Sequence, residues 1–250
     1  MRLWKIFLFA GLLVCSCGNA QVRQYRAEVV RSVPHDVHAY TQGLFFHDGT
    51  LYESTGQYGE STLRTLNPET GEVLTRQRFS RKYFLEGSCI LGDDLYLLTW
   101  TNKVVFRYDP ATLEYRATMG YNREGWGLTT DGKQLIASDG SSNLYFLDAS
   151  LKLLRKQKVT LDGRPLRLLN ELEWIDGKIW ANVYLSEVIV IINPSNGMVE
   201  ATVDCTGLLP GELRTPDTDV LNGIAVDAQG HVFLTGKNWP MMYQIRLKKK

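Results

Sequence analysis

A hairpin pattern recurs five times along this 250-residue chain, and it constrains the fold more than any other feature. Each copy has a short apolar run, a polar turn rich in Asp and Gly, and a second run in which apolar residues alternate with polar ones. This pattern is typical of a β-hairpin. The copies follow one another at intervals of about 40 to 50 residues. They begin at Gln42, Glu86, Trp126, Glu171 and Asn222.

A second hairpin follows each of the first four copies. Its turn contains Asn-Pro or Asp-Pro in three of them, as at Asn67-Pro68 and Asp109-Pro110, and Asp-Ala-Ser at residues 148–150 in the other. Proline presets one backbone dihedral, and Asn or Asp accepts hydrogen bonds from the residues that follow it, so these segments are predicted to be turns. Each repeat therefore contains four strands, which is the content of one β-propeller blade.

The two ends of the chain complement each other. The fifth copy ends at residues 241–250 with one strand too few, whereas residues 25–34 form a strand that precedes the first copy. We therefore predict an all-β, five-bladed β-propeller closed by the N-terminal strand, which completes the last blade and leaves no open edge. A two-sheet sandwich would not explain five copies of one pattern, and no amphipathic helix of useful length is predicted.

Composition narrows the class of protein. With 44% hydrophobic and 22% charged residues, the chain is expected to form one globular domain over residues 21–250. The 28 basic and 27 acidic side chains nearly cancel, so no nucleic-acid partner is expected. We expect a monomer that contacts membranes only through an N-terminal lipid anchor.

The first twenty residues resemble a signal peptide. Arg2 and Lys5 precede an apolar run from residue 6 to residue 14 that is too short to span a bilayer. Residues 14–17 resemble a bacterial lipobox ending at Cys17, and cleavage after Ala20 by an ordinary signal peptidase is the alternative. We expect an exported bacterial protein, either periplasmic or anchored to the membrane as a lipoprotein with Cys17 lipidated.

The remaining cysteines and the histidines give no metal or disulfide signature. Cys89 and Cys205 are too few for a disulfide framework, and two buried free thiols are expected. His35 and His38 precede a strand, where their spacing would place them on opposite faces, so surface or turn positions are expected for the histidines. No phosphate loop, dinucleotide motif or hydrolase elbow occurs. We expect neither a metal nor a cofactor.

Different polar and aromatic residues occupy equivalent positions of the repeats. In a propeller, the start of the innermost strand and the end of the next strand meet at one mouth of the central channel. A purely structural repeat would keep one small or apolar residue there, so the variety indicates a binding pocket. The residues at these positions are Gln42, Ser54, Thr55, Glu86, Trp100, Trp126, Asp139, Asn170, Glu171, Asn182, Tyr184, Asn222 and Lys237.

Structural roles remain open for each of these side chains. Glu86 could accept hydrogen bonds from a neighbouring turn, and Lys237 could form an ion pair with Asp139 or Glu171. The tryptophans could belong to the core, and the asparagines could cap turns.

Several motifs surround these residues in a fixed order between about Val33 and Leu247. They are VPHDVHAYTQGL from Val33, FLEGS from Phe84, GWGLTTDG from Gly125, RLLNELEWIDGKIWANVY from Arg167, DVLNGIA from Asp219 and TGKNWP from Thr235. In this order they resemble the plant and bacterial type of glutaminyl-peptide cyclotransferase, a five-bladed propeller family unrelated to the zinc-dependent animal enzymes. Agreement of separate motifs in one order is more specific than a single short match.

The resemblance implies a role for each matching residue. Glu86 corresponds to the family's catalytic acid and base, and Lys237 to the cation beside the oxyanion. The residues that correspond to the substrate pocket are Gln42, Trp100, Trp126 and Asn170.

Two positions depart from the family pattern. Tyr40 stands where the family commonly has Phe, and Tyr184 where it commonly has Trp. Both keep an aromatic face, so we expect altered specificity or affinity and unchanged chemistry. Asn182, two residues before Tyr184 at the end of the same predicted strand, is a further expected substrate-binding residue.

The reaction implied by the resemblance converts an N-terminal glutaminyl residue of a peptide or protein to 5-oxoproline and releases ammonia. The α-amine attacks the carboxamide of its own side chain, so the enzyme chiefly holds the cyclising conformer and moves one proton. A propeller that binds a peptide or glycan without catalysis is the alternative. A third alternative is a glycosidase, which would need two or three carboxylates at the mouth. Only Glu86, Asp139 and Glu171 are candidates there, and the order of the motifs argues against a glycosidase.

Overall fold

The computed structural model describes residues 21–250, and the regular structure in this range is almost entirely β-strand. Its helical content is a single short 3-10 turn, η1 (Gly211–Leu213). No helix in this part of the chain is long and apolar enough to cross a membrane. The predicted signal segment of residues 1–20, which includes Cys17, lies outside the described residues.

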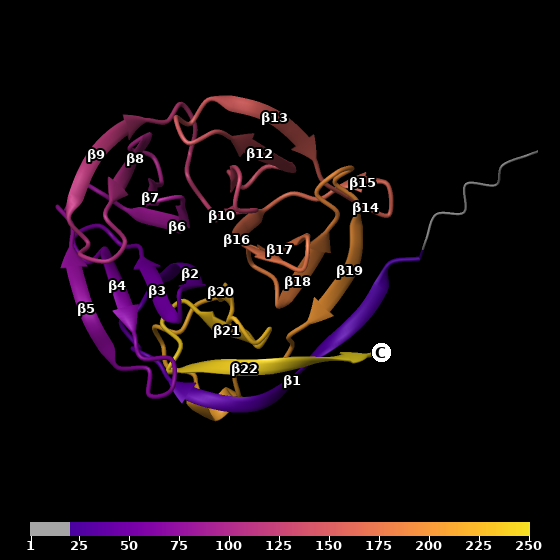
Figure 1. Ribbon diagram of the computed structural model, residues 1–250. Coiled ribbons are helices and arrows are strands. Elements are labelled where there is room, and N and C mark those ends of the chain that lie inside the picture. Colours follow the sequence, from indigo (N-terminus) through magenta and orange to yellow (C-terminus); the bar gives the residue numbers. More distant parts are fainter. Residues whose placement is uncertain (1–20) are drawn as a thin grey trace, which may run out of the picture.

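Three four-stranded antiparallel sheets follow one another along the chain, each with its strands in sequence order. The first contains β2 (Thr41–His47), β3 (Thr50–Thr55), β4 (Thr62–Leu66) and β5 (Val73–Arg78). The second contains β6 (Leu85–Leu91), β7 (Asp94–Thr99), β8 (Val104–Tyr108) and β9 (Tyr115–Gly120). The third contains β10 (Leu128–Thr130), β11 (Leu135–Ala137), β12 (Asn143–Leu147) and β13 (Leu153–Lys158). Each sheet runs from the centre of the molecule to its rim (Figure 1).

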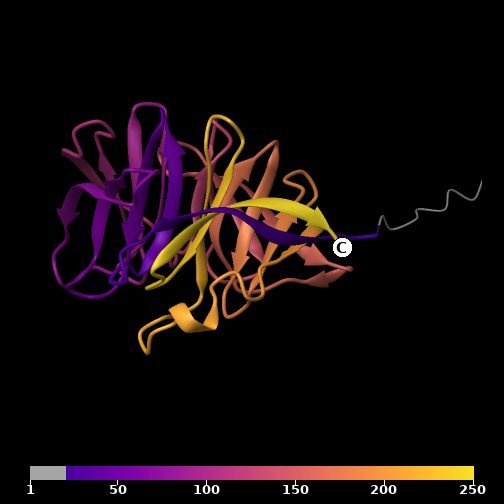
Figure 2. The same ribbon diagram turned by 90° about the horizontal axis from the view of Figure 1, so that it is seen from below.

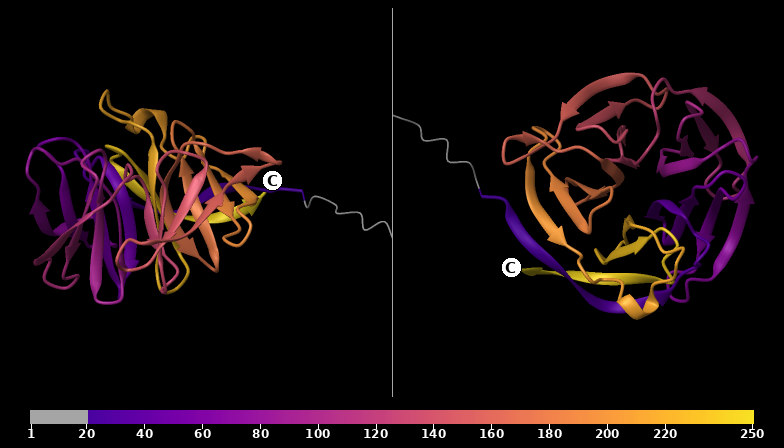
Figure 3. Two further views of the ribbon diagram at one scale, coloured as in Figure 1. Left: turned by 90° about the horizontal axis from the view of Figure 1, so that it is seen from above. Right: turned by 180° about the vertical axis from the view of Figure 1, so that it is seen from behind.

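The last two groups of strands join into one eight-stranded sheet through the N-terminal strand. Its order is β16 (Leu169–Ile175), β17 (Lys178–Val183), β18 (Val188–Ile192), β19 (Val199–Asp204), β1 (Arg23–Pro34), β22 (Met241–Lys249), β21 (Val232–Gly236) and β20 (Leu221–Val226). Strand β1 pairs antiparallel with β22 and in parallel with β19. The first and last described strands therefore lie side by side, as the views from front and back agree (Figures 1 and 3). A two-stranded ribbon, β14 (Thr160–Leu161) and β15 (Arg164–Pro165), precedes β16.

The predicted turns have the expected chemistry. Asp48 and Gly49, between β2 and β3, both have positive φ (46° and 77°), which is the geometry of a tight two-residue hairpin turn. In the second hairpin of the first sheet, the Oδ1 atom of Asn67 accepts hydrogen bonds from the backbone N–H groups of Glu69 and Thr70. These local bonds stabilise the turn and set the pairing of β4 with β5.

The innermost strands β2, β6, β10, β16 and β20 form a ring, since each contacts the next and β20 contacts β2. Glycines allow this close approach. The N–H of Gly87 in β6 donates to the carbonyl of Trp126 at 2.7 Å, and a Cβ atom on Gly87 would lie only 2.5 Å from the backbone nitrogen of Leu128. The ring brings the first residues of the inner strands together at one end of the central channel.

The apolar core is divided among the spaces between neighbouring sheets. One cluster, for example, joins Phe45 and Leu63 of the first sheet to Leu97 and Phe106 of the second. Seen from the side, the sheets form a thick disc, and the segment around η1 projects from one face (Figure 2). Cys89 and Cys205 are buried free thiols, as predicted.

Candidate active site

A cavity of about 180 Å³ opens where the inner strands begin. Its volume suits a single residue, because pockets for drug-sized ligands span about 300–1,000 Å³. The residues that line it are Tyr40, Gln42, Phe84, Glu86, Trp100, Trp126, Asn170, Tyr184 and Lys237. All of them except Phe84 were predicted from the sequence. Residues up to about 200 positions apart therefore meet at one mouth.

Glu86 is the buried carboxylate of the cavity, with 5% of its surface exposed. The Oε1 atom of Glu86 accepts a hydrogen bond from the carboxamide nitrogen of Gln42 at 3.1 Å. Gln42 is itself oriented by Asn222, whose carboxamide nitrogen donates to the Gln42 oxygen at 3.2 Å and to the Thr41 carbonyl at 2.9 Å. This chain of carboxamides directs an N–H donor at Glu86 and fixes the position of the carboxylate.

Lys237 is the cation of the cavity and is also buried. Its Nζ atom lies 4.7 Å from the ring centroid of Tyr40 and 5.1 Å from that of Tyr184. A cation placed over two aromatic faces is attracted to both rings. The hydroxyl of Tyr40 donates to Asp219 at 2.8 Å, which holds one of these rings in place.

The two charged groups perturb each other, and burial disfavours the ionised form of both. Burial raises the pKa of Glu86 well above its ordinary value of 4.5, while the positive charge of Lys237 opposes this shift. Burial lowers the pKa of Lys237, while the negative charges of Glu86 and Asp219 oppose that change. Burial therefore shifts the two pKa values in opposite directions, each favouring the uncharged form of its group.

Aromatic rings form the remaining walls. Trp126 and Tyr184 pack edge to face at 5.7 Å between ring centroids, and Phe84 packs likewise against Trp100 at 5.5 Å. The indole N–H groups of Trp100 and Trp126 both donate to Glu124. Both tryptophans are half-buried and face the cavity, so the alternative of a purely structural core role does not describe them.

The three asparagines differ in position. Asn170 lines the cavity, and its buried Oδ1 atom has no hydrogen-bond partner among the described residues. The prediction that Asn182 binds substrate is not supported, because Asn182 is fully buried in β17 and its Oδ1 atom accepts from the backbone N–H of Gly223. Asn182 therefore links β17 to β20 and is not among the residues that line the cavity. Neither Asn182 nor Asn222 caps a turn, since both lie within strands.

The ion pairs considered for Lys237 are absent from the described residues. Glu171 instead accepts hydrogen bonds from the backbone N–H groups of Leu44 and Ile224 across the channel. Asp139 accepts from the backbone N–H of Ser141. The two carboxylates that might have neutralised Lys237 are therefore occupied elsewhere.

The expectation that the histidines lie at surface or turn positions is wrong for His35. This residue is buried, and its Nε2 atom lies 2.9 Å from Glu53, which also contacts Arg64 at 3.1 Å. The opposite charges of these partners offset the cost of burial. Within residues 21–250, no group of three His, Cys, Asp or Glu side chains is placed to hold a metal ion.

Sequence reasoning missed three residues of the site. Phe84 lies directly before β6 and two positions before Glu86, so its closeness to Glu86 in the sequence could have identified it. Asn222 was recognised at the mouth but not assigned to the pocket. Glu124 lies in the connection between β9 and β10, outside the repeated hairpins, and no repeat signal marks it.

Comparison with known proteins agrees with this geometry. The sequence profile described as glutamine cyclotransferase matches residues 6–247. A glutaminyl-peptide cyclotransferase of Arabidopsis thaliana is 42% identical over 228 residues, covering 89% of this chain and 71% of the relative. The crystal structure of Myxococcus xanthus glutaminyl cyclase superposes with a TM-score of 0.86 at 36% identity, covering 92% of this chain and all of that chain. The chain therefore belongs to the glutamine cyclotransferase family.

Proposed function

We propose that this protein is a glutaminyl-peptide cyclotransferase, which converts N-terminal glutaminyl residues of peptides or proteins to 5-oxoproline and releases ammonia. The observation that carries the proposal is a buried carboxylate, Glu86, held by Gln42 in an aromatic cavity that also contains Lys237. In chemical class the reaction is an intramolecular acyl transfer, because the γ-acyl group moves from the side-chain nitrogen to the α-nitrogen.

Glu86 acts as the proton shuttle in this proposal. The neutral α-amine attacks the carbonyl carbon (Cδ) of its own side-chain carboxamide, and a C–N bond forms as the carbonyl π bond opens. The carboxylate of Glu86 takes the proton that the attacking nitrogen sheds and returns it to the departing nitrogen, so the C–N bond to the leaving group breaks and ammonia is released. Its raised pKa brings Glu86 closer to the basicity of the amines with which it exchanges the proton.

Lys237 and Asn170 complete the site by binding polar parts of the substrate. The ammonium of Lys237 stabilises the negative oxygen of the tetrahedral intermediate, because a fixed charge in a dry cavity acts strongly on a developing oxyanion. The unpartnered Oδ1 atom of Asn170 is available to accept an N–H of the substrate. The rings of Trp100, Trp126 and Tyr184 exclude water, which would otherwise compete as a nucleophile.

The direct test is ammonia release from a Gln-initiated dipeptide incubated with purified protein. The same dipeptide with an acetylated amine is the matched control, because acetylation removes the nucleophile and leaves the carboxamide. We expect the protein to release ammonia and a cyclised product from the dipeptide with a free amine, and neither from the acetylated dipeptide. Binding of the dipeptide without turnover would contradict the proposal and support a binding propeller instead.

The mechanism uses one carboxylate, one ammonium and carboxamide groups, so we propose that activity needs no metal. Dialysis against a chelator is expected to leave turnover unchanged. Loss of turnover that zinc restores would contradict this part of the proposal.

For the fold, we propose a single catalytic domain over residues 21–250 that is a five-bladed propeller closed by β1. The pairing of β1 with β22 and the ring of inner strands support this interpretation. Removing residues 21–34 should expose the edge of β22 and abolish cooperative unfolding; an unchanged melting transition would contradict closure.

For location, we propose an exported monomer that is lipidated at Cys17, on the basis of the lipobox-like residues 14–17. Substituting Cys17→Ala should release the protein from the membrane fraction. Unchanged partitioning would favour ordinary signal-peptide cleavage, with a periplasmic product.

A further inference from the structure

Glu124 connects two walls of the cavity through one oxygen atom. Its Oε2 atom accepts hydrogen bonds from the indole nitrogen of Trp100 at 3.0 Å and from that of Trp126 at 3.1 Å. Trp100 follows β7 in the second sheet, and Trp126 precedes β10 in the third. We propose that Glu124 is a positioning residue of the active site, which fixes both indole rings and acts on Glu86 through its charge. The kinetic part of this inference rests on the proposed function.

The backbone next to Glu124 is held firmly against the second sheet. The N–H of Gly125 donates to the carbonyls of Thr99 and Trp100, at 3.2 Å each. A Cβ atom on Gly125 would lie 2.7 Å from the Cβ atom of Leu98 and from the Thr99 carbonyl oxygen, so only glycine allows this approach. The segment therefore presents the Glu124 carboxylate in a defined place before substrate arrives.

The hydrogen bonds of Glu124 connect two pairs of packed aromatic rings in the cavity wall. Phe84 packs edge-on against Trp100, and Tyr184 packs edge-on against Trp126. Glu124 joins these two pairs, since its oxygen lies between the two indole N–H groups. Without the carboxylate, water would satisfy the half-buried N–H groups and each indole would be free to change rotamer. The cavity would then lose a preorganised wall, which weakens substrate binding more than it slows proton transfer.

The charge of Glu124 has a separate effect. Burial and the negative charge of Glu124 raise the pKa of Glu86, and the positive charge of Lys237 lowers it. Gln42 contributes only a neutral hydrogen bond to Glu86. Removing the charge of Glu124 should therefore lower the pKa of Glu86 and move the acid limb of kcat/KM to lower pH.

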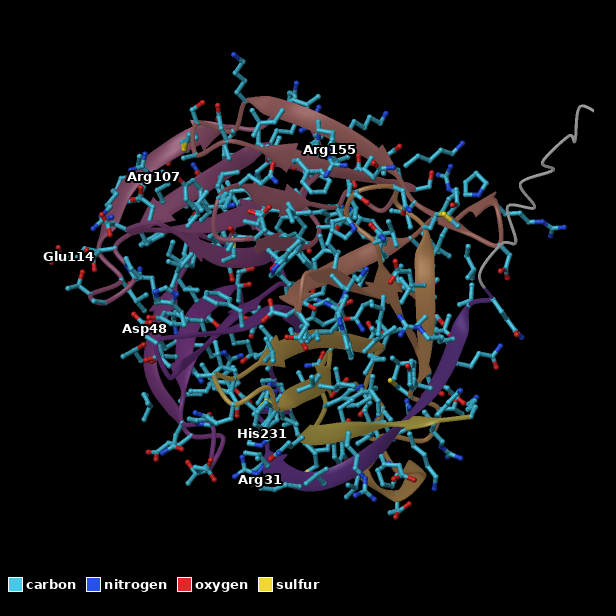
Figure 4. All side chains as sticks on the ribbon, turned by 45° about the vertical axis from the view of Figure 1, so that its right-hand side comes forward. Arg31, Asp48, Arg107, Glu114, Arg155 and His231 are labelled. Atoms are coloured by element: carbon cyan, nitrogen blue, oxygen red, sulfur yellow. The ribbon has the colours of Figure 1, made fainter. Side chains whose placement is uncertain are left out.

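Two variants separate geometry from charge. Glu124→Ala removes both hydrogen bonds and the charge, whereas Glu124→Gln removes the charge and keeps one oxygen acceptor. Glu114→Gln is the matched control, because Glu114 is exposed at the outer rim (Figure 4) and does not line the cavity. Ammonia release from a Gln-initiated dipeptide is measured across pH for each variant, together with the melting temperature.

For Glu124→Ala we expect KM to rise about 3- to 10-fold with kcat changed less than about 2-fold, because the two lost hydrogen bonds hold walls of the cavity and take no part in proton transfer. For Glu124→Gln the rise in KM should be smaller, and in both variants the acid limb should move to lower pH. The Glu114→Gln control should change neither KM nor the position of the acid limb. Unchanged KM and acid limb in both Glu124 variants would overturn the proposal, as would a loss of activity that only follows a lowered melting temperature.

The indole ¹H–¹⁵N resonances give a readout that does not depend on turnover. The signals of Trp100 and Trp126 should shift in Glu124→Ala and stay in place in the control. If the wild-type protein releases no ammonia but these signals shift, the proposed function fails and the positioning of the rings stands. Unshifted signals would overturn the positioning role even in an active enzyme.

Discussion

Two buried glutamates, Glu86 and Glu53, show how this fold gives two carboxylates opposite electrostatic surroundings. Both belong to the first two sheets and are at most 5% exposed. Glu53 is surrounded by His35 at 2.9 Å, Arg64 at 3.1 Å and the Thr41 hydroxyl at 2.6 Å. Glu86 receives a single carboxamide hydrogen bond, and its cation is held over aromatic rings nearby.

The difference in partners reverses the direction of the pKa shift. Burial would raise the pKa of Glu53, but the charges of Arg64 and His35 overcome it and lower the pKa to about 2. For Glu86, burial prevails over the charge of Lys237, and the pKa is raised. Burial alone therefore does not set the direction of the pKa shift of a carboxylate; the cations in direct contact with the carboxylate decide it.

The largest effect should come from Glu86→Gln, which keeps the size of the side chain and removes the proton acceptor. General acid–base catalysis typically contributes about 10²- to 10⁴-fold, so kcat should fall by at least the lower figure while KM changes much less. The melting temperature should not fall, because Glu86 is buried without a direct ion pair. Near-normal turnover with unchanged melting would show that Glu86 is not the shuttle.

Glu53→Gln should have the opposite signature. Removing one member of a buried ion-paired cluster leaves His35 without its carboxylate and Arg64 with Asp36 as its remaining partner, which costs about 3–5 kcal/mol of unfolding free energy. The protein that remains folded should turn over substrate at close to the normal rate. Urea unfolding beside kinetics checks this, with Glu114→Gln as the surface control, and a stable but inactive Glu53 variant would remove the contrast between the two sites.

The pH dependence should separate activity from stability. As pH falls, Glu86 is protonated first because its pKa is raised, so activity declines about tenfold per pH unit below that pKa while the fold persists. The depressed pKa of Glu53 means that its contribution to stability is complete above its ordinary value of 4.5 and is lost as pH falls towards about 2. Parallel profiles of kcat/KM and melting temperature test this. Loss of both in one pH step would contradict it.

The smallest effect should come from Tyr184→Trp, which introduces the residue common in the family. The ring of Tyr184 faces both Trp126 and Lys237, and an indole offers the cation a stronger aromatic face. We expect KM to change by less than about 10-fold and kcat by less than about 3-fold, since neither proton transfer nor the oxyanion is affected directly. A fall in kcat comparable to that of Glu86→Gln would mean that the tyrosine hydroxyl takes part in the chemistry.

Much of the site could be predicted because its residues occupy repeated positions. Gln42, Glu86 and Asn170 lie at the starts of inner strands, and Trp100 and Lys237 directly follow the next strands, so the hairpin repeat alone placed them at one mouth. The motif resemblance added Tyr40 and the roles of Glu86 and Lys237. Asn182 was misplaced because a residue's position along a strand does not settle whether its side chain reaches the cavity or packs beneath it.

The sequence by itself determined the strands, their turns and the order of the hairpins, because period-two alternation and turn chemistry act over a few neighbouring residues. Only the tertiary structure decided which side chains from different sheets meet. Glu124 accepts hydrogen bonds from two indoles next to separate sheets, and His35 is buried against Glu53. Both contacts form because the sheets pack closely against their neighbours. The pKa of Glu86 was decided in the same way: desolvation and the separation from Lys237 depend on distances across the channel, which no local pattern in the chain encodes.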